Sequence, residues 1–538
     1  MDTKRLILFV LLSFSVLLWW DYLQKKNIET QPQTLNDLSV PSPSVDIENN
    51  KTEKRIEPIG KQVIQKSQLI KVETDLYSID ISSVGGDIRN LSLKKYLADD
   101  SSSYFQLMSD SHDPLLYIAQ TGLLGENLPT HKSVFTSTQN TFQMNSDTLI
   151  VPLTFKSNGL LVKKIFTFTK DSHLIKVSYD IKNNSDNLLK MSAYYQLIHD
   201  GESNQGSAMM PSFTGTAYYN DELNFNKLSF DDVDSKEFSI LSKDGWIGII
   251  QQYFASSWIV SAGKSREFYS KKIADNIYAS GLVLPLDDLM AGESRVFDSN
   301  LYAGPQAKAE LELAAKGMTY TVDYGWLTFI ASPLFSVMSG IQKMVINWGV
   351  SIILLTVLIK LLFYPLSAAS YKSMGQMREL SPRLQSMKEK FGDDKQKMQQ
   401  AMMELYKTEK INPLGGCLPI LVQIPVFIAL YWVLLGSVEL RNAPFLYITD
   451  LSSKDPYYVL PLLMAASMFL QTKLNPKPTD PMQARIMMMM PIVFSIFFFF
   501  FPSGLVLYWL VNNILSIAQQ WYVNKKIHAE ALKKKGHA

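Results

Sequence analysis

The chain has a single cysteine, Cys417, in 538 residues. One cysteine excludes an intrachain disulfide and any zinc or iron–sulfur site built on several cysteines. Charge is also sparse, because only 19% of residues are Asp, Glu, Lys or Arg, against roughly 25% in an average soluble protein. The net charge of +2 excludes a broadly basic nucleic-acid-binding protein, so we expect no sequence-specific contact with nucleic acid. Neither a metal nor a cofactor is expected.

Long uncharged apolar runs are what the chain has instead. They cover residues 6–20, 348–370 (interrupted by Lys360), 416–438, 457–472 and 486–523. The last run would be ~57 Å long as one helix, against a hydrocarbon core of ~30 Å, so it predicts two helices. The turn signal Pro502-Ser503-Gly504 marks the break between them. The sequence therefore predicts a polytopic α-helical membrane protein with six spans, one at the start and five near the end.

The first apolar run admits two interpretations. Lys4 and Arg5 before a short apolar run are typical of a cleaved signal peptide. No small-x-small cleavage site follows, however, and the paired aromatics Trp19 and Trp20 are typical of a membrane interface. We interpret residues 1–23 as an uncleaved signal-anchor helix.

A further uncharged stretch, within residues 321–346, has a different pattern. Apolar residues recur at three- and four-residue spacing, while serine and threonine fall on the other side; the expected apolar stripe is Leu327, Ile330, Leu334, Met338, Ile341 and Val345. This pattern predicts an amphipathic helix that lies in the membrane interface. A seventh span would also place the two termini on opposite sides.

Charge then predicts the orientation. Nine lysines and arginines lie in the loop 371–415, whereas the loop 439–456 has only Arg441 and Lys454 and the turn 502–504 has none. Because basic loops stay in the cytoplasm, both termini are expected there, and the segment from about residue 21 to 345 on the far side.

The large segment between the first two spans divides in two. Residues 24–62 are rich in polar residues and Pro, which is typical of a flexible linker. Residues 63–320 show period-two alternation, for example over 161–168 and 173–183, which predicts an antiparallel β-sandwich. Further β-rich runs lie at 69–82, 148–156, 246–260, 276–284 and 295–302, and a helical pattern returns only at about 306–316.

Chemical signals in this β-rich segment are weak. Gly263-Lys264-Ser265 ends like a phosphate-binding loop, but Trp258 stands where that loop needs its first glycine. His199-Asp200-Gly201-Glu202 fits either a sugar-processing site or a turn with solvated polar residues. His112 and His131 fall in polar loops without ligand spacing.

The telling residue is Lys360, which lies near the middle of the second span. A charge at the centre of a membrane helix costs about 2.5–3.5 kcal/mol, so it implies water or a partner. Snorkelling toward the interface is the alternative. Thr356 lies on the same helical face, Gln423 is polar within the third span, and Trp509, Asn512 or Asn513, Ser516 and Gln520 recur at helical spacing in the last one. These residues are expected either to converge on one wet cavity or to make ordinary interhelical hydrogen bonds.

Two cytoplasmic segments suggest contacts with partners. Residues 372–412 are expected to form a helical hairpin whose faces carry Met387, Met398 and Met402; methionines suit either changing partners or self-packing. The tail 525–538 carries Lys525, Lys526, Lys533, Lys534 and Lys535, which suit either ribosomal RNA or anionic lipid.

Several sequence segments resemble the YidC family of bacterial membrane protein insertases. They are Asn412-Pro413-Leu414-Gly415-Gly416-Cys417, the segment 436–441, Asp455-Pro456-Tyr457-Tyr458, Asp480-Pro481-Met482 and the segment 501–508; the amphipathic stretch after Asp323-Tyr324-Gly325-Trp326 is also similar. The resemblance covers about 345–525 strongly, and the extra front span and β domain resemble the Gram-negative form. One departure is that the family's groove charge is usually arginine, whereas this chain has Lys360, which lacks the planar bidentate fork.

The resemblance implies a function. The chain would be an inner-membrane insertase and chaperone, not an enzyme, whose five-helix core (residues 347–524) encloses a hydrophilic groove open to the cytoplasm and lipid. The expected groove residues are Lys360, Thr356, Gln423, Cys417, Tyr508, Trp509, Asn512 and Ser516. Expected partners are nascent membrane proteins, the ribosome, the Sec translocon and the lipid bilayer.

Two rivals remain. A coupled transporter usually needs an intramembrane Asp, Glu or His, and the predicted spans have none. A membrane-anchored sugar-active enzyme would use the β domain, and deletion of that domain would discriminate it from an insertase.

Overall fold

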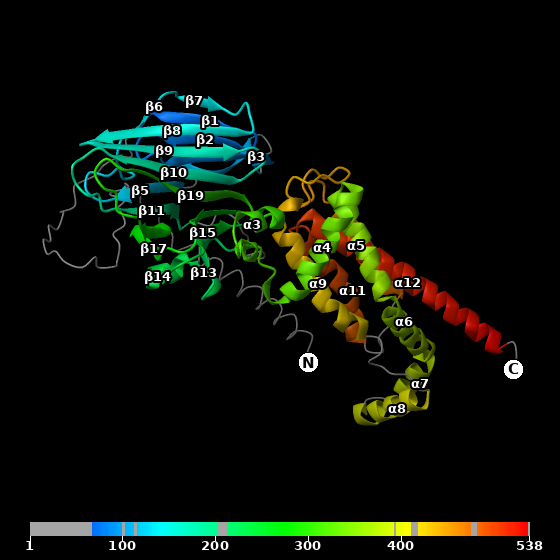
Figure 1. Cartoon of the computed structure of the whole chain (residues 1–538). Coiled ribbons are helices and arrows are strands. Elements are labelled where there is room, and N and C mark those ends of the chain that lie inside the picture. Colours follow the sequence, from blue (N-terminus) through cyan, green and yellow to red (C-terminus); the bar gives the residue numbers. More distant parts are fainter. Residues whose placement is uncertain are drawn as a thin grey trace. The chain divides into compact units, whose positions relative to one another are not determined.

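The computed structural model describes residues 67–98, 103–111, 116–201, 212–391, 394–409, 418–474 and 481–535. The expected signal anchor and linker, and the candidates Cys417, His112 and Glu202, lie outside these ranges. The described chain falls into two compact units that divide at Val322 and Asp323. We call them the β unit and the helical unit; they are blue to green and green to red in Figure 1.

The β unit is made of two large sheets. The first has the strand order β14-β17-β18-β11-β5-β4-β3-β2-β1-β7, and the second β13-β12-β15-β16-β19-β10-β9-β8-β6. All strand pairs in the described residues are antiparallel except β1 with β7. The strands are β1 (Leu69–Glu73), β2 (Tyr77–Ser82), β3 (Ile88–Leu97), β4 (Tyr104–Asp110), β5 (Leu116–Leu124), β6 (Thr136–Ser137), β7 (Thr141–Gln143), β8 (Thr148–Ser157), β9 (Leu160–Thr169), β10 (Leu174–Asn183), β11 (Ser192–Asp200), β12 (Gly215–Asn220), β13 (Asn224–Ser229), β14 (Phe238–Ser242), β15 (Trp246–Gln251), β16 (Phe254–Ile259), β17 (Arg266–Ala274), β18 (Ile277–Pro285) and β19 (Ser294–Pro305).

Contacts between the sheets show that they pack face to face. Tyr179 of β10 and Thr121 of β5 share a hydrogen bond of 2.7 Å between their hydroxyl groups. Trp258 of β16 donates from its indole N–H to the carbonyl of Gln196 in β11 (3.1 Å). The predicted alternation is visible in β9, where Val162, Phe166 and Phe168 are buried. Two short helices, α2 (Phe230–Ser235) and α3 (Lys308–Ala314), and a 3₁₀ turn η1 (Met318–Thr321) complete the unit; α2 was not predicted.

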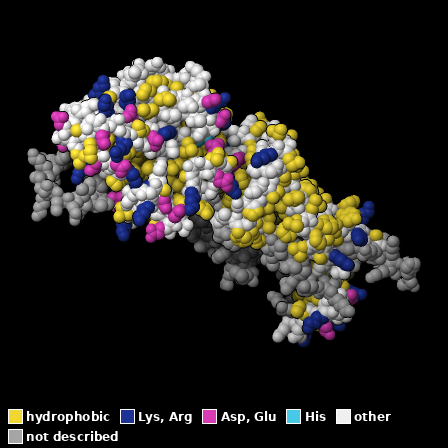
Figure 2. Space-filling model, viewed as in Figure 1, with side chains coloured by type: hydrophobic (Ala, Val, Ile, Leu, Met, Phe, Trp, Pro, Cys, Tyr) yellow, Lys and Arg dark blue, Asp and Glu magenta, His cyan; other side chains and the backbone are white. Residues whose placement is uncertain are grey.

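The helical unit begins with the 3₁₀ turn η2 (Gly325–Leu327). Its helices are α4 (Thr328–Val345), α5 (Trp348–Leu362), α6 (Tyr364–Glu379), α7 (Ser381–Phe391), α8 (Lys395–Thr408), α9 (Leu418–Gly436), α10 (Val459–Leu474), α11 (Pro481–Phe498) and α12 (Ser503–Lys535), with a 3₁₀ turn η4 (Val438–Leu440). Helix α12 contacts α5, α6, α9 and α10, and therefore forms the centre of the unit. Hydrophobic side chains cover much of the visible surface of this unit (Figure 2).

The length and hydropathy of each described helix can be compared with what a membrane span requires. Within the described ranges, no single helix is both long and apolar enough to cross a membrane, and one bent pair of helices is. That pair is Trp348–Leu362 with Tyr364–Met377, at 67° to each other. The predicted single helix over 348–370 is therefore wrong. The break at Phe363 precedes Pro365, which has no N–H to donate and disfavours helical backbone in the residue before it.

Two other helix predictions have different outcomes. The run 486–523 is split into α11 and α12, as predicted, but the break lies at Phe499–Pro502 and shares only Pro502 with the predicted turn. The amphipathic helix exists as α4, but its packed face matches the predicted stripe only in part. Of that stripe, Met338 and Leu327, the residue just before the helix, are buried, and the other buried residues of α4 are Ala331 and Phe335. Helix α4 packs against both α5 and α9, so small and aromatic residues fit this contact, while Ile330, Leu334, Ile341 and Val345 stay half-exposed.

Candidate functional site

Lys360 is a buried cation within an apolar helix. Its side chain lies in α5 with only 8% of the residue exposed. The ammonium group donates to the hydroxyl of Ser516 in α12 at 2.7 Å. Among the described residues, no carboxylate forms an ion pair with Lys360. The contact joins two helices that are 156 positions apart in the chain.

The hydroxyl groups of Ser516 and Thr356 donate hydrogen bonds to backbone carbonyls of their own helices. Ser516 donates to the carbonyl of Asn512 (2.7 Å), and buried Thr356 donates to the carbonyl of Ile352 (2.6 Å). The Ser516 hydroxyl therefore donates its proton to Asn512 and at the same time accepts a hydrogen bond from the Lys360 ammonium. Thr356 lies one turn before Lys360 on the same face.

Part of the polar stripe on α12 serves helix packing. Asn513 donates to the hydroxyl of Ser467 in α10 (2.7 Å), and Gln520 donates to the carbonyl of Leu474 (3.4 Å). Asn513 and Gln520 therefore make ordinary interhelical hydrogen bonds, which was the alternative to a shared wet cavity. Sequence reasoning missed Ser467, whose small polar side chain gave no signal within an apolar run.

Tyr508 and Trp509 lie in an aromatic cluster. The ring of Trp509 is edge-on to Phe427 of α9 (4.2 Å between centroids) and to Phe498 of α11 (4.9 Å). Tyr508 is buried and faces Phe427 at 5.8 Å. Gln423 is half-buried one helical turn before Phe427. The structure thus places Tyr508 and Trp509 in apolar packing of α9, α11 and α12.

The loop between α9 and α10 closes one end of the helical unit. Asn347, which caps α5, donates to the carbonyl of Pro444 (3.1 Å). At the start of α12, the N–H groups of Ser503 and Gly504 donate to the carbonyls of Ser453 (2.7 Å) and Leu451 (2.9 Å). We call this end, made of residues 344–349, 437–458 and 499–504, the outward end, because charge predicts that it faces away from the cytoplasm. No local sequence pattern indicates that this loop is so firmly packed.

The hairpin that the sequence predicts in the cytoplasm is a pair of helices with a small core. Leu380 and Leu384 are buried there, and Met402 packs against them. Asp394 caps α8 by accepting from the backbone N–H of Lys397 (3.1 Å). Met387 and Met398 are half-buried, so self-packing accounts for Met402 more fully than for the other two.

The basic tail continues α12 without a break. Lys525 and Lys526 are exposed, and the Lys525 ammonium lies 5.3 Å from the ring centroid of Trp521. The side chains of Lys533, Lys534 and Lys535 lie outside what the structure describes.

The histidines of the β unit that the structure describes are buried. His199 is fully buried between the rings of Tyr117 and Phe230, and burial lowers its pKa to about 4, so the ring is neutral near pH 7. The interpretation of 199–202 as a turn with solvated polar residues is therefore wrong for His199. His131 is also buried, and its ring shares a 2.7 Å hydrogen bond with the Tyr194 hydroxyl.

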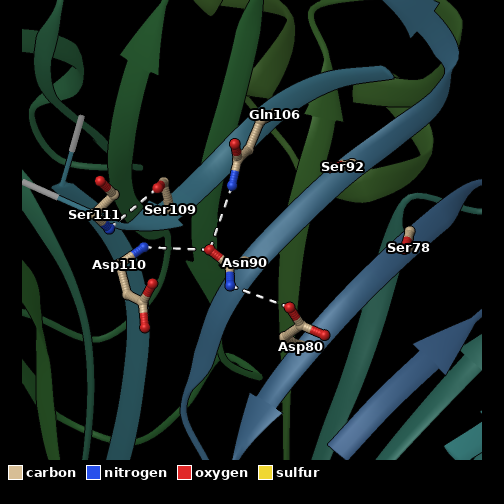
Figure 3. A pocket seen from close by; sticks show the side chains of 8 residues that line it. All are labelled: Ser78, Asp80, Asn90, Ser92, Gln106, Ser109, Asp110 and Ser111. Carbon is tan, nitrogen blue, oxygen red and sulfur yellow. Dashed lines mark hydrogen bonds between the residues drawn. The ribbon is translucent and has the colours of Figure 1, made fainter. Parts of the chain in front are cut away.

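A polar cleft of about 420 Å³ lies over β2, β3 and β4. Figure 3 shows its eight lining residues, which are serines, amides and carboxylates. Asn90 donates to Asp80 (3.1 Å) and accepts from the amide of Gln106 (3.3 Å), so these groups satisfy one another. The lining contains no histidine or lysine that could complement a carboxylate in acid–base chemistry.

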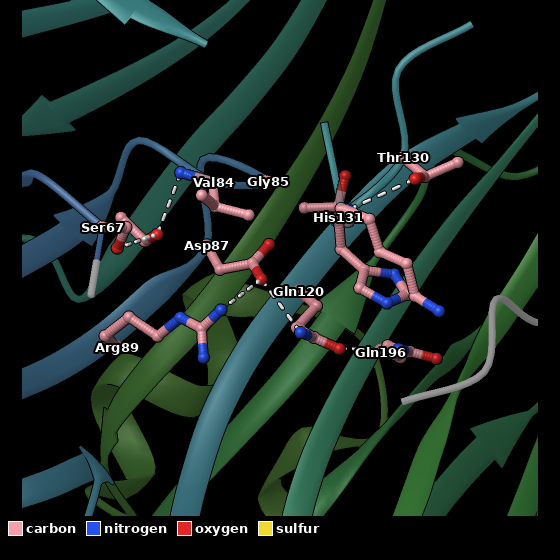
Figure 4. Close-up of polar contacts among 12 residues, drawn as sticks. Ser67, Val84, Gly85, Asp87, Arg89, Gln120, Thr130, His131 and Gln196 are labelled. Atoms are coloured by element: carbon pink, nitrogen blue, oxygen red, sulfur yellow. Dashed lines mark hydrogen bonds and ion pairs between the residues drawn. The ribbon is translucent and has the colours of Figure 1, made fainter. Parts of the chain in front are cut away.

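A buried polar network crosses the first sheet (Figure 4). Asp87 accepts from the amide of Gln120 (2.9 Å) and pairs with Arg89 (3.4 Å); Gln196 donates to Gln120 (2.8 Å). Lys164 donates to the carbonyl of Gly85 (2.9 Å). Burial raises the pKa of Asp87 to about 6, against the attraction of Arg89 and Lys164, and burial lowers the pKa of Lys164 to about 8. Within the described residues, no group of His, Cys, Asp and Glu could hold a metal ion.

Comparison with known proteins covers the whole chain. A family model described as "60Kd inner membrane protein" matches residues 340–530, and one described as "YidC periplasmic domain" matches residues 69–337. A "Membrane protein insertase YidC" of Methylobacillus flagellatus is 57% identical over 550 aligned residues, which are 100% of both chains. One of Aromatoleum aromaticum is 46% identical, over 98% of this chain and 99% of the relative. The solved structure "Active YidC insertase crystal structure with the first transmembrane domain resolved" is 18% identical with a TM-score of 0.42, over 85% of this chain and 93% of that one.

Proposed function

Because the chain belongs to the YidC family of membrane protein insertases, we propose that it inserts nascent proteins into the inner membrane through a hydrophilic groove centred on Lys360. It is an inner-membrane protein with a periplasmic domain, which is the β unit. The substrates are nascent chains whose apolar segment enters the bilayer while a short hydrophilic flank crosses it. The chain also helps such segments fold, alone or with the Sec translocon.

The buried ammonium of Lys360 is the observation that carries this proposal. A lysine in a membrane helix is costly unless water or a polar partner compensates it. Its partner in the structure is the neutral hydroxyl of Ser516, so the positive charge remains uncompensated by any described carboxylate. We propose that an acidic residue in the translocating flank supplies that opposite charge for a short time. The lysine ammonium would bind this carboxylate as a point charge, which requires a less exact geometry than bidentate binding by an arginine guanidinium.

The firmly packed outward end supports a direction of transport. Hydrogen bonds from Asn347, Ser503 and Gly504 tie the 437–458 loop to the starts of α5 and α12. A groove between these helices would then open to the cytoplasm and lipid, with Thr356, Gln423, Asn512, Ser516 and Cys417 in its wall. The apolar segment would leave along α9 and α11, next to Tyr508 and Trp509.

Energy and partners complete the proposal. The sequence has no nucleotide-binding motif, so transfer of apolar surface into lipid, the membrane potential or a partner would drive insertion. The hairpin of α7 and α8 receives the nascent chain, and the basic end of α12 contacts the ribosome. We propose six membrane spans with both termini in the cytoplasm, and a reaction without metal or cofactor.

A charge-swap experiment tests the groove. We expect Lys360→Ala and Lys360→Glu to impair insertion of a substrate with an acidic translocated tail, and Lys360→Arg to preserve it. Lys360→Glu should recover insertion when the acidic residues of the tail are replaced by lysine. Lys473→Ala, an exposed lysine at the end of α10, is the matched control. Equal protease protection of the acidic-tailed substrate by wild type and Lys360→Ala would refute the role of the charge.

Deletion of the β unit separates this function from that of a sugar-active enzyme. An insertase whose groove lies in the helical unit should keep most of its insertion activity without residues 67–320. An enzyme whose active site were the polar cleft of Figure 3 would lose all of its activity on this deletion.

A further inference from the structure

The two units differ in which residues adopt left-handed backbone. Among the described residues of the β unit, every non-glycine residue with positive φ is Asn or Asp: Asn127, Asn158, Asp171, Asn224 and Asn276. These side chains tolerate the conformation through local hydrogen bonds. In the helical unit the corresponding residues are Ile346, Asn442, Leu446 and Tyr458. Aliphatic and aromatic side chains have no such compensation, and a branched one is especially unfavourable there.

Ile346 and Leu446 stand where glycine is the usual residue. Ile346 is the C-cap of α4, with φ of 55°, and its N–H donates to the carbonyl of Gln342 at 2.7 Å. Leu446 has φ of 54° in the tight turn between Phe445 and Ile448, whose backbones exchange hydrogen bonds of 2.8 and 2.9 Å. Their side chains are 83% and 84% exposed. Packing within the described chain therefore does not explain why these positions carry large apolar residues.

All three strained residues belong to the outward end. Ile346 directly precedes Asn347, which binds Pro444 next to the turn of Leu446. Tyr458, with φ of 56°, immediately precedes α10, and its N–H donates to the carbonyl of Asp455 (3.2 Å). Figure 1 shows the loop beside the beginning of α5. The exposed side chains are thus held in fixed positions at the level where α5 and α10 begin.

Exposed apolar side chains continue from this level along both helices. On α5 they are Leu354, Leu358 and Leu361, and on α10 they include Leu462, Phe469 and Leu470. Tyr457, which is 70% exposed, and Tyr458 are of the type enriched where acyl chains meet head groups. This continuity points to lipid as the occupant of the same surface at the outward end.

We propose that Ile346, Leu446 and Tyr458 form a lipid anchor that inserts into the outer leaflet and fixes the depth of the helical unit. The backbone cost at each position is offset by transfer of an apolar side chain from water into lipid. Lys360 lies 12 residues beyond Trp348 on α5, about 18 Å along the helix. A fixed depth at the outward end would therefore set how far the ammonium lies below the outer surface. The proposal rests on the membrane placement given above.

Depth-dependent quenching tests the anchor in the full-length chain. With Cys417 replaced by serine, Ile346→Cys and Leu446→Cys are labelled with bimane and reconstituted into phosphatidylethanolamine–phosphatidylglycerol vesicles. Thr449→Cys, an exposed polar position of the same loop, is the matched control. We expect lipids brominated near the head group to quench most of the fluorescence at 346 and 446, and aqueous iodide to quench 449. Stronger quenching by iodide than by brominated lipid at 346 and 446, or quenching by neither, would overturn the proposal; the second result would indicate a protein cover.

A second set of variants separates anchoring from folding. Leu446→Gly suits the left-handed backbone and removes a side chain that is 84% exposed, so the thermal unfolding midpoint in detergent should not fall. The bimane at 346 should nevertheless lose quenching by brominated lipid, because the helical unit lies less deeply in the bilayer. Unchanged quenching in this background would show that Leu446 does not set the depth. Insertion by the wild-type protein is measured separately, so failure of the anchor would leave the proposed groove standing.

Discussion

The ring of Phe445 occupies the space that a side chain on Gly349 would need. A Cβ atom built on Gly349 would lie 2.2 Å from Cδ2 of Phe445, so only glycine at the start of α5 lets the outward loop pack there. We expect Gly349→Ala to displace the ring and to lower the free energy of unfolding by about 1–3 kcal/mol, as overpacking does.

A glycine without neighbours provides the control for this substitution. A Cβ on Gly340 of α4 would meet nothing within 4 Å, so Gly340→Ala should stabilise the helix by up to about 1 kcal/mol. Thermal unfolding of both variants in detergent is the measurement. Equal effects of the two substitutions would contradict the packing argument.

Replacement of Ser516 tests how Lys360 is positioned. Ser516→Ala removes the acceptor on α12 and should cost about 1.5–3 kcal/mol of stability, the range for hydrogen bonds to charged groups. Insertion of acidic-tailed substrates should fall less than in Lys360→Ala, because the charge remains. Ser516→Thr keeps the hydroxyl and should restore both stability and insertion. If threonine behaves like alanine in the protease-protection assay, the hydroxyl is not what positions the lysine.

Orientation is tested by thiol labelling after Cys417 is replaced by serine. A cysteine at Thr449 should react with an impermeant maleimide added from the periplasmic side of intact spheroplasts. A cysteine at Gln396, an exposed residue in the first turn of α8, should react only after permeabilisation. The reverse pattern would overturn the proposed topology.

Two deletions should separate ribosome contact from substrate reception. Removing residues 525–538 should abolish most of the salt-sensitive association with ribosomes, because binding of lysines to RNA phosphates weakens steeply with salt. Removing residues 383–410 should abolish insertion with little change in ribosome binding. Unchanged co-sedimentation of the tail deletion at low salt would show that another surface holds the ribosome.

Asp87 should make the stability of the β unit depend on pH. Its folded pKa is raised to about 6 from an ordinary 3.8, so the folded state holds the proton more tightly than the unfolded state. The contribution of Asp87 to stability should therefore decrease as pH rises from about 4 to about 6, by at most about 3 kcal/mol. His199, whose pKa is lowered to about 4, contributes in the opposite direction over this range, so the effect of Asp87 is measured as the difference in stability between wild type and Asp87→Asn.

Urea unfolding of the full-length protein at several pH values measures this dependence. Asp147→Asn removes an exposed carboxylate of the same unit and should leave the wild-type pH profile unchanged. A stability difference between wild type and Asp87→Asn that stays constant from pH 4 to pH 6 would refute the role of Asp87.

Sequence reasoning was most informative where one face of an element is buried. The alternation in β9 and the break at Pro502 are local patterns, and both appear in the structure. Strands β5 and β11, which were not predicted, are buried along nearly their whole length on both faces and therefore show no period-two pattern. The closure around Gly349 and the burial of His199 depend on partners far away in sequence, so no local pattern could reveal them.

Helix α12 runs unbroken over 33 residues, which is about 50 Å, whereas a hydrocarbon core needs only ~30 Å. In the proposed membrane placement, the helix that carries Ser516 therefore extends well past the hydrocarbon core as a stiff rod that ends among the tail lysines. A ribosome bound to those lysines would be coupled to the Lys360 contact by a rigid lever. Its pull or tilt would reach the contact between α5 and α12 mechanically, before any part of the nascent chain arrives there.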